Sequence, residues 1–319
     1  MPVLRLAAAA VFSLAAAAPA AAQVFSIGTN PQGSLMYSTG TAISKVMAQK
    51  AGKQYRVAPY GGSSTYVPLV NKAELEFGVA NSGELSFAYT STGTFESGPK
   101  FSNLRMVASL VPTLSGFIVR TESGMKKVAD LKGKRLPTEY TAGRIFYYIS
   151  ESNLATVGYS AKQAPTQVPV PNFNEAVEAL ISGRADAAYV GLNAGVSQKA
   201  MASIRGGIRM LTLENTPDAQ KKIADSFPSG RISPVRPAKE NIGVVDDPTW
   251  LFTVDFFLFT HDKLPDEVAY EVAKTLHANK EELAKVHPAM EEFSPANMAM
   301  KTVVPFHPGA QKFYSEKGM

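Results

Sequence analysis

The sequence predicts an α/β protein of two similar lobes with a ligand cleft between them. Three observations indicate this fold class. Short apolar strands alternate with helical segments along the chain. One helix–turn–strand segment recurs at an offset of about 110 residues. A length of 319 residues suits two domains, and 45% hydrophobic residues with 18% charged residues can build a sizeable core.

Residues 1–22 have the pattern of a secretory signal peptide. One Arg precedes an Ala-rich apolar stretch, Pro19 breaks it, and small residues end at Ala22. A membrane anchor is the alternative, but an apolar run of about 17 residues, mostly Ala, is near the minimum for a span. We therefore expect cleavage between Ala22 and Gln23, a periplasmic mature protein and no membrane insertion. The chain has no Cys, which excludes disulfides and thiol chemistry.

The mature chain opens with strand–turn–helix units. We expect a strand over 24–28, a turn over 29–33, and a helix capped by Ser34 and closed by Gly52. A second strand over 56–60 ends in the turn GGSST, a helix follows, and residues 77–80 form a third strand. Such alternation is typical of parallel sheets flanked by helices.

The internal repeat relates VNKAELEFGVAN, residues 70–81, to LISGRADAAYVG, residues 180–191. In both, a helix ends, a turn follows, and an acidic residue (Glu76 or Asp186) precedes an apolar strand. Chance likeness between two βα units is the alternative. Under either interpretation, the spacing fits two similar lobes.

Lobe boundaries follow from the segments around the middle of the chain. VADLKGKRL, residues 128–136, predicts a helical turn, a glycine stop and a strand that open the second lobe. Residues 233–248 are rich in Pro and polar residues and predict a long surface connection. Residues 249–261 are almost continuously apolar and predict a buried strand, with a helix from Pro265 after it. We expect lobe one over 24–116 plus 253–319, lobe two over 117–252, and a cleft at the hinge.

The polar turns after these strands are candidate anion sites. Helix N-termini present free backbone N–H groups and a positive dipole end, and in open α/β sheets such turns gather at the carboxyl ends of the strands. For the Ser and Thr residues, ordinary N-capping is the alternative, and the two roles can coexist. Tyr140, Tyr147 and Phe252 either wall the pocket or belong to the core. The candidate ligand-binding residues are Thr29, Asn30, Ser34, Tyr37, Ser63, Ser64, Thr65, Asn81, Ser82, Tyr140, Thr141, Arg144, Tyr189 and Asn193.

Arg144 stands out because it lies in the first turn of an expected helix. The positive dipole end disfavours a cation there by roughly 0.3–1 kcal/mol. A carboxylate gripped by the guanidinium would offset that cost. The alternatives are a pair with Glu139 or Glu151, or simple exposure to solvent.

Four stretches carry a family resemblance: SIGTNPQGSLMYSTGTAISKVM, YGGSSTYVPLVNKAELEFGVANS, KKVADLKGKRL and VPFHPGAQKFYSEKG. The chain resembles a solute receptor of the TAXI type from a tripartite (TRAP) transporter. The resemblance implies a type II periplasmic-binding-protein-like fold and capture of a small organic acid, such as a glutamate-like or 2-oxo acid, by lobe closure. It also implies docking on TRAP membrane subunits driven by an ion gradient. We expect a monomer. TEYTAGRIF departs from the small residues usual at this turn.

Two other functions remain as alternatives. A receptor of an ATP-driven (ABC) importer would share the two lobes and the DLKGK stretch, whereas the Tyr37 helix and the HPGA tail favour the TAXI type. A secreted enzyme is poorly supported, because the four His residues form no HExxH or other metal-spaced pair and no G-x-S-x-G elbow or P-loop occurs. We expect no catalytic residue, metal or cofactor. A net charge of +5 without a basic run does not support a nucleic-acid partner.

Overall fold

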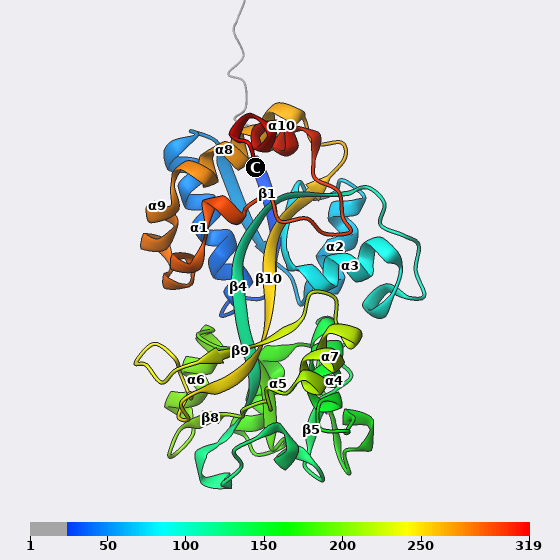
Figure 1. The fold of residues 1–319 in the computed structure, drawn as a ribbon, viewed down its shortest axis with the longest axis vertical. Coiled ribbons are helices and arrows are strands. Elements are labelled where there is room, and N and C mark those ends of the chain that lie inside the picture. Colours follow the sequence, from blue (N-terminus) through cyan, green and yellow to red (C-terminus); the bar gives the residue numbers. More distant parts are fainter. Residues whose placement is uncertain (1–23) are drawn as a thin grey trace, which may run out of the picture.

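A computed structural model describes residues 24–319 as two stacked lobes joined by two long strands (Figure 1). The predicted signal peptide lies outside the described residues. The fold class is confirmed: a mixed sheet runs through the molecule and helices cover it.

The first lobe carries the parallel strands of the main sheet. β2 (Gln54–Pro59), β1 (Val24–Thr29) and β3 (Phe77–Asn81) lie side by side in that order, and β10 (Thr249–His261) pairs antiparallel with β3. The turns after the parallel strands lead into α1 (Leu35–Lys50), α2 (Ser63–Asn71) and α3 (Ser82–Thr90), as the sequence predicts. The remaining helices of this lobe are α8 (Asp266–Ala278), α9 (Lys280–Val286) and α10 (Pro308–Lys317).

The two crossings between the lobes are continuous strands. β4 (Leu104–Arg120) pairs antiparallel with β10, and the register places Phe252 opposite Ser115. The expected boundaries at 116/117 and 252/253 therefore fall inside hydrogen-bonded strands. The expected connection over 233–248 is partly wrong, because β9 (Arg231–Val235) extends into it and pairs with β10. The aperiodic part covers residues 236–248.

The second lobe is built on the far half of β4. β7 (Ala187–Gly191) and β8 (Ile208–Met210) pair with it, while β5 (Leu136–Thr138) and β6 (Gln167–Pro169) form a separate parallel pair. The helices of this lobe are α4 (Ile145–Ala155), α5 (Phe173–Ile181), α6 (Gly195–Ser203) and α7 (Pro217–Ser226).

The predicted repeat is present as structure. α2 leads into β3 and α5 leads into β7 by similar turns. The Glu76 carboxylate accepts a hydrogen bond of 2.7 Å from the backbone N–H of Ser26, on the adjoining strand β1. The Asp186 carboxylate accepts one of 2.8 Å from the N–H of Arg135, just before β5. Each acid thus binds a backbone N–H group in or next to another strand of its own lobe.

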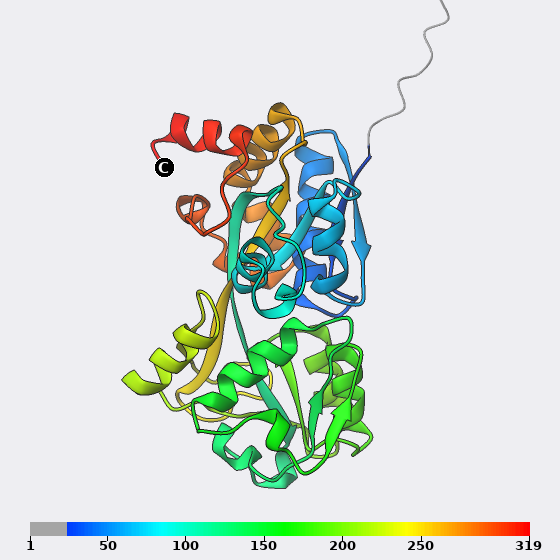
Figure 2. The same ribbon diagram turned by 90° about the vertical axis from the view of Figure 1, so that its right-hand side faces the viewer.

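The apolar core shows how the lobes sit together. One cluster belongs to the first lobe and one centres on the second, while a third is shared between them. In the shared cluster, Phe87 of α3 packs against Phe227 and Tyr148 of the second lobe, with ring centroids 5.6 and 5.5 Å apart. Figure 2 shows the turns of the first lobe resting on the second lobe. The molecule is therefore in a closed arrangement.

Candidate functional site: a cavity enclosed between the lobes

Backbone contacts between the lobes close the cleft. A Cβ atom on Gly62, at the start of α2, would lie 2.2 Å from the carbonyl oxygen of Ala142. A Cβ on Gly195 would lie 3.3 Å from the Cα of Gly33. Only residues without side chains allow approaches this close. The hydroxyl group of Tyr148 also donates a 2.7 Å hydrogen bond to the carbonyl oxygen of Gly93 across the seam.

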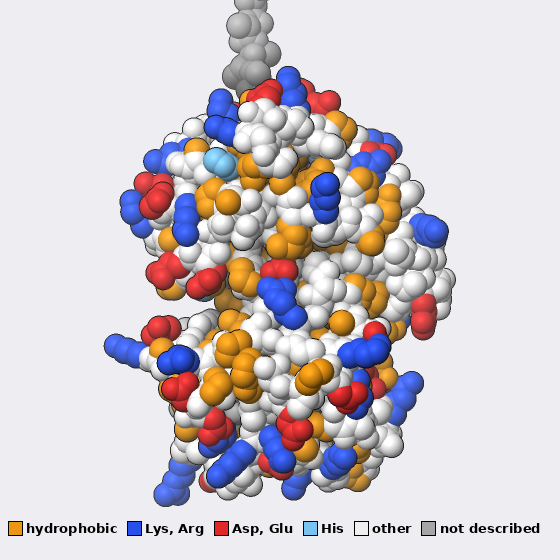
Figure 3. All heavy atoms as spheres, viewed as in Figure 1, with side chains coloured by type: hydrophobic (Ala, Val, Ile, Leu, Met, Phe, Trp, Pro, Cys, Tyr) orange, Lys and Arg blue, Asp and Glu red, His pale blue; other side chains and the backbone are white. Residues whose placement is uncertain are grey.

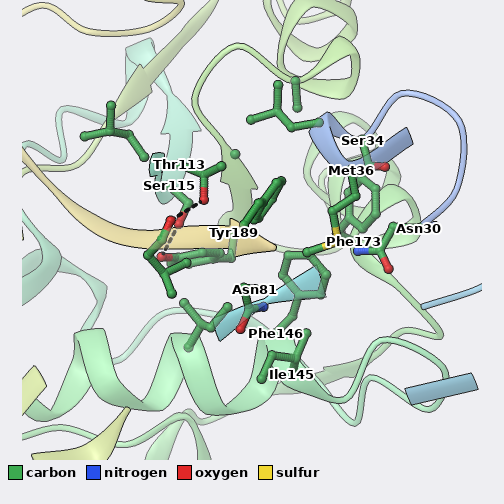
Figure 4. Close-up of a pocket in the computed structure, with 17 residues that line it drawn as sticks. Asn30, Ser34, Met36, Asn81, Thr113, Ser115, Ile145, Phe146, Phe173 and Tyr189 are labelled. Atoms are coloured by element: carbon green, nitrogen blue, oxygen red, sulfur yellow. Dashed lines mark hydrogen bonds between the residues drawn. The ribbon is translucent and has the colours of Figure 1, made fainter. Parts of the chain in front are cut away.

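Between these contacts lies a cavity of about 60 Å³ (Figure 4). Its wall is mostly apolar, with a few polar side chains and no Lys, Arg, Asp, Glu or His. The polar lining residues are Asn30, Ser34, Asn81, Thr113, Ser115 and Tyr189. The others are Leu35, Met36, Leu114, Ile145, Phe146, Ile149, Phe173, Gly191, Ala194, Val254 and Phe256.

Five helices begin at the cavity wall. The Ser34 hydroxyl caps α1 by accepting from the N–H of Tyr37 at 3.0 Å, and the Asn81 side-chain oxygen caps α3 by accepting from the N–H of Glu84 at 2.7 Å. Ile145 and Phe173 are the first residues of α4 and α5, and Ala194 is the N-cap residue of α6. Helix N-termini carry partial positive charge, so their convergence favours an anionic or strongly accepting group in the cavity.

The hinge strands contribute a set of neutral hydrogen-bonding groups. The hydroxyl groups of Ser115 and Tyr189 lie 2.9 Å apart, as Figure 4 shows. Thr113 donates to the carbonyl oxygen of Val254 at 2.9 Å. Burial raises the pKa of Tyr189, so its hydroxyl remains protonated. Opposite, the buried side-chain oxygen of Asn30 has no hydrogen-bond partner among the described residues. A solute with a donor group would satisfy it.

The structure brings some predicted site residues together and separates others. Of the predicted set, Asn30, Ser34, Asn81 and Tyr189 line the cavity. Thr29, Ser63 and Ser82 are buried outside its wall, and Thr65 is exposed. The Tyr37 hydroxyl accepts from the Gln32 amide at 3.2 Å, and the Asn193 amide nitrogen lies 3.4 Å from the Asn241 oxygen. Ser64 is half-buried at the first turn of α2.

Arg144 lies beside a different hollow. A second space of about 570 Å³ is lined by Thr138, Glu139, Tyr140, Thr141, Arg144, Tyr147, Tyr148, Lys162 and Gln167. Arg144 is exposed, and within residues 24–319 no acidic side chain lies within 4.0 Å of its guanidinium. Glu151, one expected partner, instead accepts hydrogen bonds from Ser160 and Ala161. Phe252 is fully buried in the shared apolar cluster.

Sequence reasoning missed most of the cavity wall. Ile145, Phe146, Ile149 and Phe173 look like ordinary core positions in a helix pattern, and only the tertiary structure places them at the cavity. The sequence of β4 held a usable signal. Its hydroxyl-bearing residues Thr113 and Ser115 are two positions apart and therefore share one face of the strand.

The comparisons with known proteins address the family and the fold. A family model described as the NMT1-like family matches residues 27–318. The chain belongs to the NMT1-like family. Its fold is similar to that of a solved structure titled "Structure of a periplasmic transporter", at 16% identity over 92% of each chain with a TM-score of 0.58.

Two further structures of this fold were solved with ligands. MatC from Rhodopseudomonas palustris with bound malate is 13% identical to this chain over 92% of it and 96% of MatC, with a TM-score of 0.56. The alkanesulfonate-binding protein SsuA from Xanthomonas axonopodis pv. citri, bound to MOPS, is 15% identical over 88% of this chain and 87% of SsuA, with a TM-score of 0.52. The expected type II periplasmic-binding-protein fold is thereby confirmed.

Two features are absent from residues 24–319, a membrane-spanning helix and a cluster of metal ligands. None of the helices there has the length and apolarity needed to traverse a bilayer. No three acidic or His side chains in the same range lie close enough together to hold a metal ion. Figure 3 shows Lys/Arg and Asp/Glu side chains interspersed over one face of the molecule, without a stripe of one sign.

Proposed function

We propose that this protein is a periplasmic solute receptor that captures a small organic acid by closing its two lobes. The observation that carries the proposal is the convergence of five helix N-termini on one enclosed, mostly apolar cavity at the hinge. Solute contacts from both lobes favour the closed state, because a ligand shifts an equilibrium toward the state to which it binds better.

The cavity chemistry favours an acid with a short apolar body. Its wall has no cation to attract the acid, so the negative charge would be held by backbone N–H groups at the helix N-termini and by neutral donors such as Tyr189. The Phe146, Phe173 and Ile149 side chains suit an apolar segment next to that group. Malate in MatC and MOPS in SsuA both carry an acid group, which agrees with the proposal.

For the partner, we propose the membrane subunits of a TRAP transporter. The support is the resemblance of the opening strand and Tyr37 helix, and of the HPGA tail, to TAXI receptors. His307 of that tail is fully buried, and its Nδ1 caps α10 by accepting from the N–H of Gly309 at 3.2 Å. An ABC importer is the alternative partner. Reconstituted uptake separates them, since TRAP transport follows an ion gradient and ABC transport requires ATP.

The test of the substrate class is calorimetry on protein beginning at Gln23, unfolded and refolded to remove any carried-over solute. A panel of mono- and dicarboxylates is compared with the corresponding neutral amides. We expect an acid to bind and its amide to bind at least about tenfold more weakly, a difference of about 1.4 kcal/mol. Equal binding of acid and amide would contradict an anion site.

A further inference from the structure

The first turn of α3 contains a buried carboxyl group that the solute site does not use. Glu84 is fully buried, and neither of its carboxyl oxygens has a hydrogen-bond partner among the described residues. The hydroxyl groups of Ser63 and Ser64, at the start of α2, lie close enough to lower its pKa, and they too have no partner within hydrogen-bonding limits among the described residues. An ionised carboxylate without partners is costly to bury. Either a function or a compensating interaction should therefore account for the burial of this carboxyl group.

The second lobe covers this carboxyl group. The Ala142–Gly143 backbone rests on Gly62, at the N-terminus of α2. The Phe227 ring rests on Gly83, next to Glu84, so closely that a Cβ there would lie 2.1 Å from it. These contacts come from the other lobe and are lost when the lobes separate. Opening would therefore return Glu84 to water.

Within residues 24–319, the opposite charge that acts on Glu84 also comes from the second lobe. Burial raises the pKa of Glu84 to about 8, while the Ser63 hydroxyl, the Arg144 charge and the Ser64 hydroxyl act in the opposite direction. On its own lobe, Tyr66 of α2 faces it, but its hydroxyl donates to the carbonyl oxygen of Val79 and burial raises its pKa, with the Glu84 charge adding to the effect.

The other elements that pack on α3 bring no free charge to Glu84. β3 carries no ionisable side chain. Asp255 of β10 is paired with Arg231 at 2.9 Å, and Glu96, after the 3-10 turn over 93–95, acts on Tyr148. At the end of α7, next to Phe227, Asp225 is paired with Lys221. Among the described residues, Arg144 is thus the cation whose charge acts on Glu84, from beyond ion-pair distance.

We propose that Glu84 and Arg144 form an interlobe latch that links closing of the lobes to protonation of Glu84. In the open state the hydrated carboxyl group has its ordinary pKa near 4.5, and in the closed state its pKa is higher. The closed state therefore holds the proton more tightly. Closing is favoured at acidic pH and weakens as pH rises from about 4.5 toward 8, because the carboxylate must then be protonated or buried with its charge. Arg144 limits this loss because its positive charge favours the ionised form.

The latch can be tested without knowing the solute. The chain has no Cys, so Lys45→Cys on α1 and Arg205→Cys after α6 place one spin label on each exposed surface of the two lobes. Pulsed electron–electron double resonance on solute-free protein then gives the ratio of closed to open molecules. We expect this ratio to fall at least about tenfold between pH 6 and pH 8.5. A ratio that does not change with pH would overturn the latch.

Three variants assign the effect to the pair. Glu84→Gln should show, at every pH, the ratio of closed to open molecules that the parent shows at acidic pH. Glu84→Met gives the same test if the Gln side chain disturbs folding. Glu74→Gln, an exposed control on the same lobe, should follow the parent. Arg144→Ala should lower the closed fraction at pH 8.5, leave it unchanged at pH 5.5, and have no effect in the Glu84→Gln background. A pH dependence that persists in both Glu84 variants, or an Arg144→Ala effect that persists in Glu84→Gln, would contradict the proposal.

Discussion

Gly62 and Ala142 meet backbone to backbone across the cleft, on opposite lobes. A Cβ at Gly62 would lie 2.2 Å from the Ala142 carbonyl oxygen and 2.6 Å from the Cα of Gly143. Neither neighbour is the movable end of a side chain. The backbone of Gly62 itself is extended, with a φ of 174°, which any residue can adopt. The glycine is therefore required by closure and not by the fold of its own lobe.

Gly62→Ala should block full closure without unfolding the protein. The added methyl group cannot be accommodated unless the second lobe moves away. We expect solute affinity to fall at least about tenfold, and small-angle scattering to show an expanded molecule in the presence of solute. Gly98→Ala is the matched control, because its Cβ would lie an ordinary 3.4 Å from the Phe95 carbonyl oxygen. Unchanged affinity in Gly62→Ala would show that closure at this seam is not needed for capture.

Asn81→Asp should separate the capping role of this residue from its place in the cavity wall. Asp caps helices as well as Asn does and suits the helix dipole, but Asn81 is buried beside Glu84, so the folded protein should lose some stability while still folding. The new negative charge faces the cavity and should weaken binding of an acid by at least about 1.4 kcal/mol, measured by calorimetry. Thr216→Asp, at the N-cap of α7, a helix with no residue in the cavity wall, should bind normally. Binding that is unaffected by Asn81→Asp would argue for a neutral solute.

Tyr148→Phe should shorten the lifetime of the closed complex. It removes the interlobe hydrogen bond to the Gly93 carbonyl oxygen and leaves the ring packing on Phe87. A hydrogen bond of this kind contributes about 0.5–1.5 kcal/mol, so we expect solute release, followed by stopped-flow fluorescence, to quicken about 2- to 12-fold. Tyr159→Phe is the control, since the Tyr159 hydroxyl accepts from Gly133 within the second lobe. Equal release rates in the parent and Tyr148→Phe would mean that this bond breaks after the solute leaves.

Acid should destabilise the protein through its buried histidines. Burial lowers the pKa of His307 below its usual value near 6.5. In the unfolded chain His307 takes up a proton near pH 6.5, whereas in the folded chain it resists. With respect to His307, the folded protein therefore has its full free energy of unfolding above pH 6.5. This stability is lost as the pH falls through the pKa that His307 has in the folded chain.

His307→Asn should reduce this acid sensitivity, because Asn can still cap α10 but does not titrate. Burial also lowers the pKa of His261 and His287, so part of the sensitivity should remain. The measurement is the free energy of unfolding by urea between pH 5 and pH 8. An identical pH dependence in His307→Asn would show that His307 does not control acid stability.

Local pattern was enough to determine most elements of this protein. The alternation of strands and helices, the cap Ser34, the turn over 128–136 and the long strand over 249–261 all depend on neighbours within a few residues. For that reason their signals are in the sequence. The repeat also revealed that Glu76 and Asp186 hold equivalent places, because a duplicated unit repeats its local hydrogen-bonding needs.

Tertiary structure decided which of these groups share a site. The cavity gathers Asn30 and Asn81 from one lobe, Tyr189 from the other, and Thr113 and Ser115 from a hinge strand. The separation of these residues along the chain carries no information on the distance between them in space. The same reason explains why the sequence did not reveal the group on which Arg144 acts. Its place in a helix start was visible in the sequence, but the carboxyl group on which its charge acts, Glu84, lies 60 residues earlier and belongs to the other lobe.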